Sequence, residues 1–256
     1  MKLIGIIPAR MDASRFPGKP LHKIIDRPMI SHVWGRAKLY NKWDHLAIAT
    51  CDDEIFNFSK DKNYKCYMTS KTHTRALDRV CEAVTKINNL NISDDDIIVN
   101  VQGDEPMIHP EMFDCLIDPI IKNDHINATI LGMLIEEEDI WRNPDTVKII
   151  SNNSNEILYT TRSQVPYNNN KFSKSIEARR IYGLFAFKYK FLKAFSDHDE
   201  TRLEKLESCD SNRTLDMNFR QYLSPYKFIK SYSVDSFDDI KKVESNIIKD
   251  KYWGKY

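Results

Sequence analysis

Three basic side chains follow closely on a short apolar run at the beginning of the sequence. Residues Leu3–Ile7 are apolar throughout, and Arg10, Arg15 and Lys19 come soon after them. Cations so close to the end of a buried strand repel one another and lose hydration unless an anion lies among them. The arrangement therefore predicts a loop that binds a phosphate-bearing ligand, in preference to an ordinary solvated surface loop.

The turn that carries Lys19 is restrained on both sides. Pro17 and Pro20 restrict the backbone, whereas Gly18 permits a close approach to a ligand. The usual nucleotide-binding fingerprints, GxxxxGK(S/T) and GxGxxG, do not occur in the sequence. The expected phosphate loop is therefore of another type.

A carboxylate follows a second apolar run, at Ile97–Val101. Asp104 comes after this run by way of Gly103, so its side chain is expected at the ligand-facing edge of a sheet. A nucleoside triphosphate needs Mg²⁺, which prefers carboxylate and phosphate oxygens as ligands. Asp235 has a similar setting after Ser231–Val234, and its alternative role is to cap the following helix. Asp104 is thus a candidate metal ligand.

The first half of the chain alternates between expected strands and helices. Strands are predicted from short apolar runs at Leu3–Ile7, His45–Thr50, Tyr64–Met68 and Ile97–Val101. Helices are predicted from Pro28 onward, from Asp52 to about Lys60, and from Thr74 to about Ile87. This alternation predicts a doubly wound α/β sheet, in which ligands collect at the carboxyl ends of the strands.

The second half changes character after a helix over Glu111–Lys122 and a strand over Ala128–Leu134. Antiparallel strands are predicted at Val147–Ile150, Ile157–Thr161 and Ile181–Phe187, and a polar loop at Asn168–Ser175. The remaining expectations are a helix over Leu203–Tyr222, a strand over Phe228–Ser233, a helix from Ser236 to Lys249 and a frayed tail at Lys251–Tyr256. We expect one domain over residues 1–256, with a small antiparallel excursion at about 135–190.

Composition excludes several other classes of protein. The 256 residues are 41% hydrophobic, which allows one sizeable core. Lys and Arg total 38 against 37 Asp and Glu, so the net charge of +1 provides no global field for nucleic acid or an anionic membrane. The five cysteines are scattered and never in CxxC spacing, which favours reduced thiols in the cytoplasm. No signal-peptide pattern and no apolar run of the ~20 residues that span a bilayer is present.

Several motifs carry a resemblance to a known family. Pro8–Arg10 followed by Ser14–Leu21 is similar to the opening signature of sugar-acid cytidylyltransferases, especially the 3-deoxy-manno-octulosonate (Kdo) cytidylyltransferases. Val99–Ile108, VNVQGDEPMI, is similar to the central motif of that family. Weaker blocks follow in family order at Asn143–Lys148, Tyr159–Pro166 and Val234–Ile240. The resemblance covers nearly the whole chain and implies a Rossmann-like fold of the nucleotide-diphospho-sugar transferase type.

The resemblance also implies a reaction, in which an acceptor oxygen attacks the α-phosphorus of CTP and pyrophosphate is released. Such a transfer needs positioning and charge neutralisation more than an acid/base pair. The catalytic residues that it implies are Arg10, Arg15, Lys19 and Asp104, with Asp104 and Asp235 as the pair that holds Mg²⁺. The implied nucleotide-binding residues are Pro8, Ala9, Arg10, Ser14, Arg15, Lys19, His73 and Arg79.

The acceptor-facing residues depart from the family pattern. The resemblance implies that Gln102, Arg162, Phe185 and Asp210 face a small acidic sugar. Arg-Ala-Leu replaces the Ser-Gly-Thr of the family within His73–Arg79, and Ile181 and Phe185 stand where the family has an imidazole and a phenol. Because lost hydroxyl contacts normally change substrate preference, the reaction type is predicted more firmly than the sugar.

Three alternatives remain open. The first is a cytidylyltransferase for another acceptor, such as a different ulosonic acid or a phosphonate. The second is a glycosyltransferase, which would normally present Asp-x-Asp where this chain has Gly103–Glu105. The third is a non-catalytic nucleotide-binding protein, which the presence of both Asp104 and Asp235 disfavours. The resemblance further implies a homodimer formed through the excursion.

Overall fold

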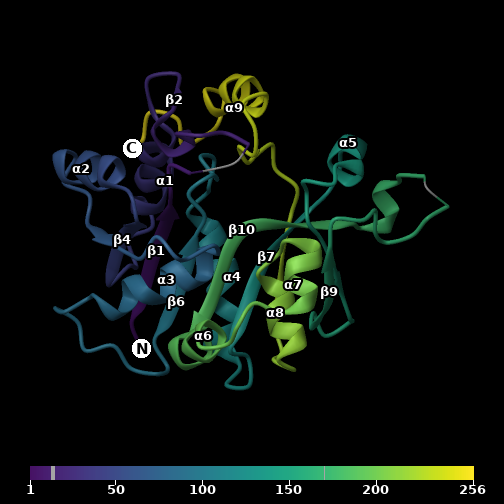
Figure 1. Cartoon of the computed structure of the whole chain (residues 1–256). Coiled ribbons are helices and arrows are strands. Elements are labelled where there is room, and N and C mark those ends of the chain that lie inside the picture. Colours follow the sequence, from purple (N-terminus) through teal and green to yellow (C-terminus); the bar gives the residue numbers. More distant parts are fainter. Residues whose placement is uncertain (13–14, 170) are drawn as a thin grey trace. The chain divides into compact units, whose positions relative to one another are not determined.

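Two compact units make up the chain in the computed structural model, which describes residues 1–12, 15–169 and 171–256 (Figure 1). Unit 1 consists of Met1–Phe113 together with Lys230–Tyr256, and unit 2 consists of Asp114–Ile229. Unit 1 is thus built from both ends of the sequence. The excursion expected at residues 135–190 falls within unit 2.

The sheet of unit 1 is parallel, in the strand order β6-β1-β4-β5. Its strands are β1 (Leu3–Ala9), β4 (His45–Thr50), β5 (Cys66–Met68) and β6 (Ile97–Val101). Every residue of β4 and β6 is buried, as expected for strands covered on both faces. Pairing of Ile4 with His45 and of Leu3 with Ile97 sets the register, so the carboxyl ends of the strands share one edge.

Amphipathic helices cover this sheet because their apolar residues recur at helical spacing. Ile30, Val33 and Ala37 of α1 are fully buried, and α3 contacts both β1 and β4. The helices of unit 1 are α1 (Met29–Lys38), α2 (Asp53–Asp61), α3 (Ala76–Thr85) and α9 (Asp239–Ile247). Short elements η1 (Lys19–Leu21), β2 (Lys23–Ile24) and β3 (Arg27–Pro28) connect β1 to α1.

Unit 2 contains mixed and antiparallel strands. Strand β7 lies between β11, which runs parallel to it, and β10, which runs antiparallel. Strand β8 pairs with both β10 and β9. The strands are β7 (Ala128–Leu134), β8 (Lys148–Ser151), β9 (Ile157–Thr161), β10 (Arg179–Lys188) and β11 (Tyr222–Tyr226). The helices are α4 (Glu111–Lys122), which belongs to unit 2 from Asp114 onward, α5 (Glu138–Arg142), η2 (Lys174–Ile176), α6 (Tyr189–Ser196), α7 (Arg202–Glu207) and α8 (Ser211–Asp216).

The predicted α/β fold class is confirmed, but two elements near the end of the chain were predicted wrongly. The single helix expected over Leu203–Tyr222 is broken at Ser208, whose φ of 51° is left-handed and ends α7. The strand expected over Phe228–Ser233 lies earlier, at Tyr222–Tyr226. Pro225 interrupts the strand pattern in the sequence, yet it is tolerated because β11 is an edge strand.

The tail at Lys251–Tyr256 is packed, so the prediction of a frayed terminus was wrong. The Tyr256 hydroxyl lies 2.8 Å from Nδ1 of His32, and the Tyr256 carbonyl accepts a hydrogen bond from Arg27 at 2.8 Å. A Cβ added to Gly35 would lie 2.4 Å from the Tyr256 ring, so α1 approaches this ring closely. Just before the tail, Asp250 pairs with the fully buried Arg36 at 2.8 Å.

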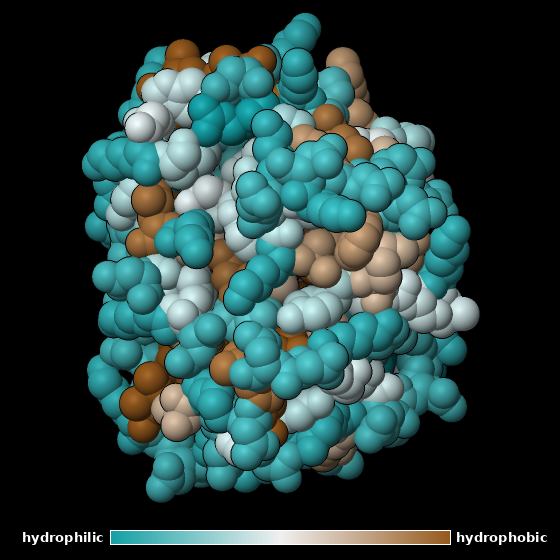
Figure 2. Space-filling model, turned by 90° about the vertical axis from the view of Figure 1, so that its left-hand side faces the viewer, coloured by the Kyte–Doolittle hydropathy of each residue, from teal (hydrophilic) through white to brown (hydrophobic). Residues whose placement is uncertain are grey.

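The surface agrees with the balanced composition. The face shown in Figure 2 is mostly hydrophilic, with small hydrophobic patches between the polar side chains. Across the described residues, no helix is both long and apolar enough to cross a bilayer.

Candidate active site

The carboxyl ends of β1 and β6 approach each other closely enough to require a glycine. A Cβ added to Gly103 would lie 2.5 Å from the carbonyl oxygen of Pro8, well inside contact distance. Gly103 therefore lets the turn after β6 pass beside the end of β1. This close approach places Gln102 and Asp104 next to the segment that carries Arg10.

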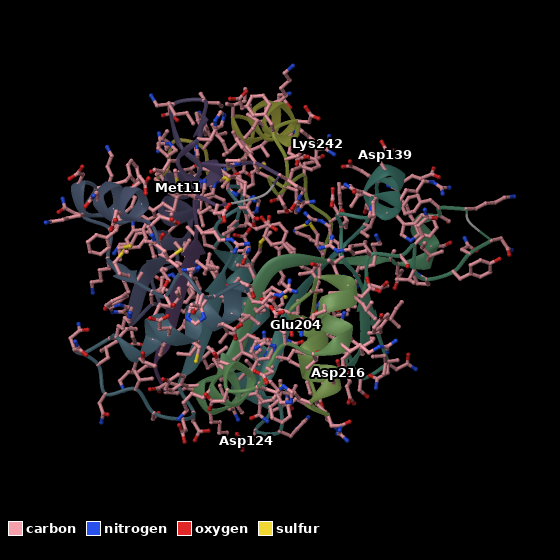
Figure 3. All side chains as sticks on the ribbon, viewed as in Figure 1. Met11, Asp124, Asp139, Glu204, Asp216 and Lys242 are labelled. Atoms are coloured by element: carbon pink, nitrogen blue, oxygen red, sulfur yellow. The ribbon has the colours of Figure 1, made fainter. Side chains whose placement is uncertain are left out.

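The loop that follows β1 is anchored at several points. Gly18, with a φ of 75°, donates its N–H to the carbonyl of Met11 at 2.9 Å (Met11 is labelled in Figure 3). The buried Phe16 ring packs edge-on against His22 and Phe237, with ring centroids 5.0 and 5.5 Å away. The loop is thus attached to the segment that precedes α9, and η1 fixes Lys19 at its end.

Two ion pairs join this loop to the candidate metal ligands. Lys19 Nζ lies 2.8 Å from Asp104 Oδ2 and also donates to the Val234 carbonyl at 2.8 Å. Arg15 Nη2 lies 3.1 Å from Asp235 Oδ1. Side chains from three distant parts of the sequence therefore meet at the carboxyl edge of the sheet, as the sequence predicted for this edge.

Backbone contacts hold the two aspartates in neighbouring positions. The N–H of Val234 donates to the carbonyl of Asp104 at 3.0 Å, which ties the segment before Asp235 to the turn after β6. The carboxylate of Asp239 accepts hydrogen bonds from the backbone N–H of Asp235 at 2.9 Å and of Ser236 at 2.7 Å. Asp239 was missed by sequence reasoning, although Ser236-x-x-Asp239 is a capping-box spacing that could have identified it.

The proximity of Asp104 affects the pKa of Asp235. Burial and the neighbouring Asp104 charge raise the pKa of Asp235 to about 6, against the opposing effects of Lys19 and Arg15. A carboxylate destabilised by a second carboxylate is stabilised again by any cation placed between them. The two aspartates therefore concentrate negative charge at this site, and the side chains of Lys19 and Arg15 place positive charge beside it.

The donor set suits Mg²⁺. Two carboxylates offer hard oxygen ligands, and Mg²⁺ is commonly held by one or two carboxylates with phosphate oxygens and water completing its shell. Within residues 1–12, 15–169 and 171–256, no group of three or more His, Cys, Asp or Glu side chains could hold a metal without such help. Asp104 and Asp235 thus fit a metal that arrives with a nucleotide better than a permanently enclosed one.

The remaining predicted nucleotide-binding residues lie at the same edge of unit 1. Pro8 and Ala9 are the buried last residues of β1, and the Arg10 side chain directly after them is exposed. Ser14 lies outside the described residues. His73 follows β5, and its Nε2 lies 2.5 Å from Glu82 Oε2.

Arg79 holds the segment around His73 instead of projecting from it. Its guanidinium is buried and donates to the hydroxyl of Thr69 at 2.6 Å and to the carbonyl of His73 at 3.3 Å. Glu82 supports the same segment by accepting the N–H of Ser70 at 2.9 Å. These contacts show Arg79 acting on the loop, so its predicted contact with a nucleotide stays a prediction. Glu82 was missed, since a Glu on a helix has no distinctive signal in the sequence.

The four predicted acceptor residues are divided between the units. Gln102 belongs to unit 1, where its amide oxygen accepts from Asn100 at 3.3 Å. Phe185 is a buried residue of β10 in unit 2, and Asp210 immediately precedes α8.

Arg162 makes an extensive set of contacts within unit 2. Its guanidinium donates to the carbonyls of Glu207 at 2.7 Å, Pro144 at 3.0 Å, Asp145 at 3.1 Å and Ser208 at 3.3 Å. It therefore connects two turns of unit 2. The predicted role of Arg162 at an acceptor carboxylate stays a prediction.

A buried lysine beside Arg162 was also missed by sequence reasoning. Lys148 is fully buried, and its ammonium donates to the carbonyls of Asn143, Thr146 and Arg162 at 2.7–2.9 Å. Burial and the nearby Arg162 lower the pKa of Lys148 to about 8. Lys148 was included in the Asn143–Lys148 block that carries the family resemblance, but no role was predicted for it, because a lysine within a short strand pattern does not indicate burial.

Comparison with known proteins agrees with this geometry. The family model described as cytidylyltransferase matches residues 4–223. A 3-deoxy-manno-octulosonate cytidylyltransferase from Thermodesulfovibrio yellowstonii is 34% identical over 250 residues, which cover 95% of this chain and 97% of the relative. A mitochondrial enzyme of the same name from Arabidopsis thaliana is 32% identical, over 95% of this chain and 82% of its own length.

A solved structure provides an equally extensive match. The structure of CMP:2-keto-3-deoxy-manno-octonic acid synthetase complexed with CTP superposes with a TM-score of 0.84 at 28% identity, covering 97% of this chain and 99% of that one. With its cations and carboxylates at the carboxyl edge of a parallel sheet, the protein is a nucleotidyltransferase, and specifically a cytidylyltransferase. The chain belongs to the family of Kdo cytidylyltransferases.

Proposed function

We propose that this enzyme transfers CMP from CTP to a Kdo-type sugar acid, with the help of Mg²⁺. The acceptor hydroxyl oxygen forms a bond to the α-phosphorus of CTP, the bond to the pyrophosphate leaving group breaks, and the hydroxyl proton passes to water. The observation that carries the proposal is the pair of contacts from Lys19 to Asp104 and from Arg15 to Asp235. The names of the relatives supply the nucleotide and the acceptor class.

The basic side chains act on the triphosphate. Lys19 and Arg15 are paired with carboxylates, so a bound triphosphate would exchange one set of anionic partners for another. Arg10 and Arg15 can hold phosphate oxygens in two-point contacts, whereas Lys19 provides a compact charge. Neutralising the charge that develops on the leaving group is the main contribution expected of such residues.

Asp104 and Asp235 hold the magnesium in this proposal. When bound, the metal supplies Lewis-acid stabilisation of the phosphate oxygens. The chain contributes the rigid mount: the turn fixed by Gly103 positions Asp104, and the carboxylate of Asp239 fixes the backbone that carries Asp235. Asp239 is therefore a positioning residue in this proposal.

The acceptor is the least constrained part of the proposal. Gln102, next to Asp104, can contact a sugar acid with a neutral amide that leaves the metal undisturbed. The buried Phe185 and the half-buried Ile181 replace polar groups of the family pattern, and this favours an alternative acceptor such as another ulosonic acid or a phosphonate. The carbonyl-bound state of Arg162 supports the same alternative.

The experiment that tests the proposal is a measurement of pyrophosphate release with CTP, Mg²⁺ and a panel of acceptors that includes Kdo and a phosphonate. UTP and ATP serve as controls for the nucleotide. We expect release with CTP and Kdo. Release only with another acceptor would keep the mechanism and replace the sugar, whereas no release with any acceptor would reject the proposed reaction.

We also propose a homodimer formed through residues 135–190. Leu158 and Tyr167 in this segment are large hydrophobic residues with exposed fractions of 54% and 76%. We expect the wild-type mass of a dimer in sedimentation, and a monomer when Leu158 and Tyr167 are both changed to Asp. Leu206→Asp, at an equally exposed position outside the segment, is the control. A wild-type monomer, or a dimer retained in the double variant, would contradict the proposal.

A reducing compartment such as the cytoplasm is proposed for the protein. All five cysteines are free thiols, which is usual where glutathione keeps thiols reduced. The relative from Arabidopsis thaliana is named as mitochondrial, so the compartment varies among relatives.

A further inference from the structure

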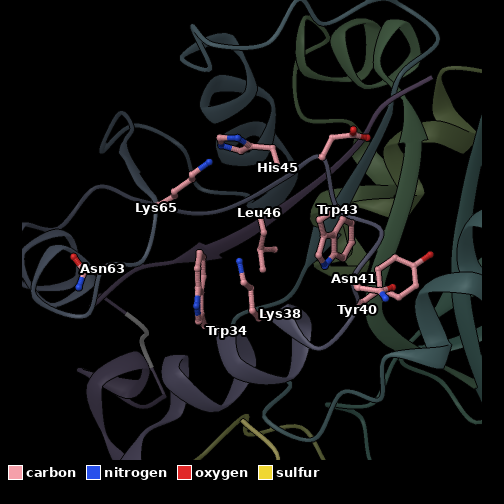
Figure 4. A pocket seen from close by; sticks show the side chains of 10 residues that line it. Trp34, Lys38, Tyr40, Asn41, Trp43, His45, Leu46, Asn63 and Lys65 are labelled. Atoms are coloured by element: carbon pink, nitrogen blue, oxygen red, sulfur yellow. The ribbon is translucent and has the colours of Figure 1, made fainter.

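Unit 1 contains a pocket at the opposite end of its strands from the candidate active site. The pocket has a volume of about 410 Å³ and is lined by residues of α1, of the segment before β4 and of the segment before β5 (Figure 4). His45 and Leu46, the first residues of β4, line it. The active-site residues follow the carboxyl ends of the parallel strands, about 20 Å away for a strand of this length.

Two tryptophans form aromatic walls that are already fixed in position. The Trp34 ring is stacked on Tyr64, with centroids 4.6 Å apart and an interplanar angle of 20°. The Trp43 indole N–H donates to the Ala37 carbonyl at 2.8 Å. A Cβ added to Gly5 would lie 3.1 Å from the Trp43 ring, so β1 also restrains it. The walls therefore need no rearrangement to receive a flat ligand.

The charge of the pocket is positive. Lys38 and Lys65 line it from two sides, and neither ammonium forms a hydrogen bond or an ion pair with the part of the chain that the structure describes. Asp44 also lines the pocket, but its Oδ2 accepts the backbone N–H of Leu3 at 2.7 Å. Two lysines without carboxylate partners beside aromatic walls are suited to an organic anion.

A buried nitrogen in the pocket wall lacks a partner. His45 is 3% exposed, and its Nε2 lies 3.1 Å from the Tyr67 hydroxyl. Its Nδ1 is buried without a hydrogen-bond partner among the described residues. Because neighbouring strand residues point to opposite faces, this imidazole lies on the other face of β4 from Leu46 (Figure 4). Burial and the positive Lys65 lower the pKa of His45 to about 4, so the imidazole is neutral at pH 7.

We propose that this pocket is a second binding site, separate from the active site, for a small aromatic carboxylate or sulfonate. The aromatic ring of the ligand packs against the aromatic side chains of the pocket, and its anionic group contacts Lys38 and Lys65 (Figure 4). The volume falls within the usual range of roughly 300–1,000 Å³ for small-molecule sites.

The test is calorimetric titration of the full-length protein with 2-naphthoate. We expect saturable binding at one site, and affinity reduced about tenfold by Lys38→Met and by Lys65→Met, since each removes one charge contact. Lys62→Met, which changes an exposed lysine outside the pocket, is the matched control and should not alter affinity. 2-Naphthalenemethanol, which has the same ring without the charge, should bind at least about tenfold more weakly.

A second titration separates this pocket from the active site. Saturating CTP should leave naphthoate affinity unchanged, and Lys38→Met and Lys65→Met should leave turnover unchanged. Displacement of naphthoate by CTP would show that the anion binds in the active site and would overturn the proposal. Absence of saturable binding, equal affinity for the uncharged analogue, or equal effects of Lys62→Met and Lys38→Met would overturn it as well.

Discussion

The ion pairs of the candidate active site in unit 1 and one ion pair of unit 2 differ in their access to solvent. In unit 1, the side chains of Lys19 and Asp104 are 13% and 22% exposed, and those of Arg15 and Asp235 are 47% and 37% exposed. In unit 2, Arg213 and Glu204 form a pair at 2.8 Å with side chains 1% and 0% exposed, and Glu204 is labelled in Figure 3. A ligand can reach the first set and cannot reach the second.

This difference separates charges for which we propose a role in catalysis from charges that stabilise the fold. Partly exposed pairs contribute little to stability because water competes for them, so their partners can be exchanged for a ligand at low cost. A buried pair whose hydrogen bonds are satisfied becomes strongly destabilising when only one partner is removed. Substitutions in the two units should therefore affect different measurements.

The largest expected effect is on turnover, in unit 1. Asp104→Asn should lower the rate of pyrophosphate release about a thousandfold, because it removes a charge that holds the proposed metal. CTP should still bind weakly, and the free energy of unfolding should change by less than about 1 kcal/mol. Asp61→Asn, at an exposed end of α2, is the control. Unchanged turnover in Asp104→Asn would remove this residue from the metal site.

The largest effect on stability is expected in unit 2. Arg213→Met should lower the free energy of unfolding by about 3–5 kcal/mol, because Glu204 is left charged and buried. Denaturant titration measures the loss, and Glu204→Met in the same protein should recover much of it. Arg220→Met removes a partner from an exposed pair with Glu156 and should cost under about 1 kcal/mol. Equal losses for Arg213→Met and Arg220→Met would break the contrast between buried and exposed pairs.

Mild acid should destabilise unit 1 through two histidines. Burial lowers the pKa of both His32 and His45 to about 4, against an ordinary value near 6.5. Below pH 6.5 the unfolded chain binds protons that the folded chain does not, so stability is full above pH 6.5 and falls toward pH 4. The loss by pH 5 should be roughly 2 kcal/mol for each histidine.

The measurement is the free energy of unfolding between pH 7 and pH 5, where Glu82, Glu111 and Asp250, with pKa values lowered to about 2, stay ionised. Asp235, whose pKa is raised to about 6, gains a proton in the folded chain over the same range and opposes this loss, so the comparison is made in the Asp235→Asn background. In that background His45→Gln should reduce the slope by about half, since one of the two buried histidines is removed. An identical slope in this variant would show that His45 is not buried in its neutral form.

The smallest expected effect distinguishes two roles of Arg162. Arg162→Lys should lower the free energy of unfolding by about 1–2 kcal/mol, because a lysine cannot reach the four carbonyls that the guanidinium contacts. Arg202→Lys, at an exposed position of α7, is the control. A raised KM for the acceptor with unchanged stability would instead support the role implied by the family resemblance.

Local sequence signals were sufficient for the fold of unit 1 and for the core of its site. Apolar runs of strand length predicted β1, β4 and β6, because strands buried on both faces have no polar positions. The position of Asp104 just after such a run predicted that its side chain would lie at the carboxyl edge of the sheet, but the sequence did not predict its pairing with Lys19.

Contacts between distant residues with ordinary local patterns were not predictable. Nothing near Lys148 or Arg213 in the sequence indicates burial, because only the folded turns of unit 2 bring the carbonyls of Asn143, Thr146 and Arg162 and the carboxylate of Glu204 to these side chains. The broken helix at Ser208 was missed for a related reason: a left-handed serine has no signature comparable with glycine. The tail at Lys251–Tyr256 was misjudged because its partners on α1 are more than 200 positions earlier.

The division of unit 1 between the two ends of the chain has a consequence for synthesis on the ribosome. Strands β1, β4, β5 and β6 emerge first, but Asp235, α9 and the packed tail follow only after all of unit 2 has been translated. Domains generally fold as they emerge from the ribosome. Unit 2 is therefore fully translated while unit 1 still lacks residues Lys230–Tyr256, which include α9. A premature stop or a ribosomal pause within unit 2 thus leaves a nascent chain that has Lys19 and Asp104 but no Asp235.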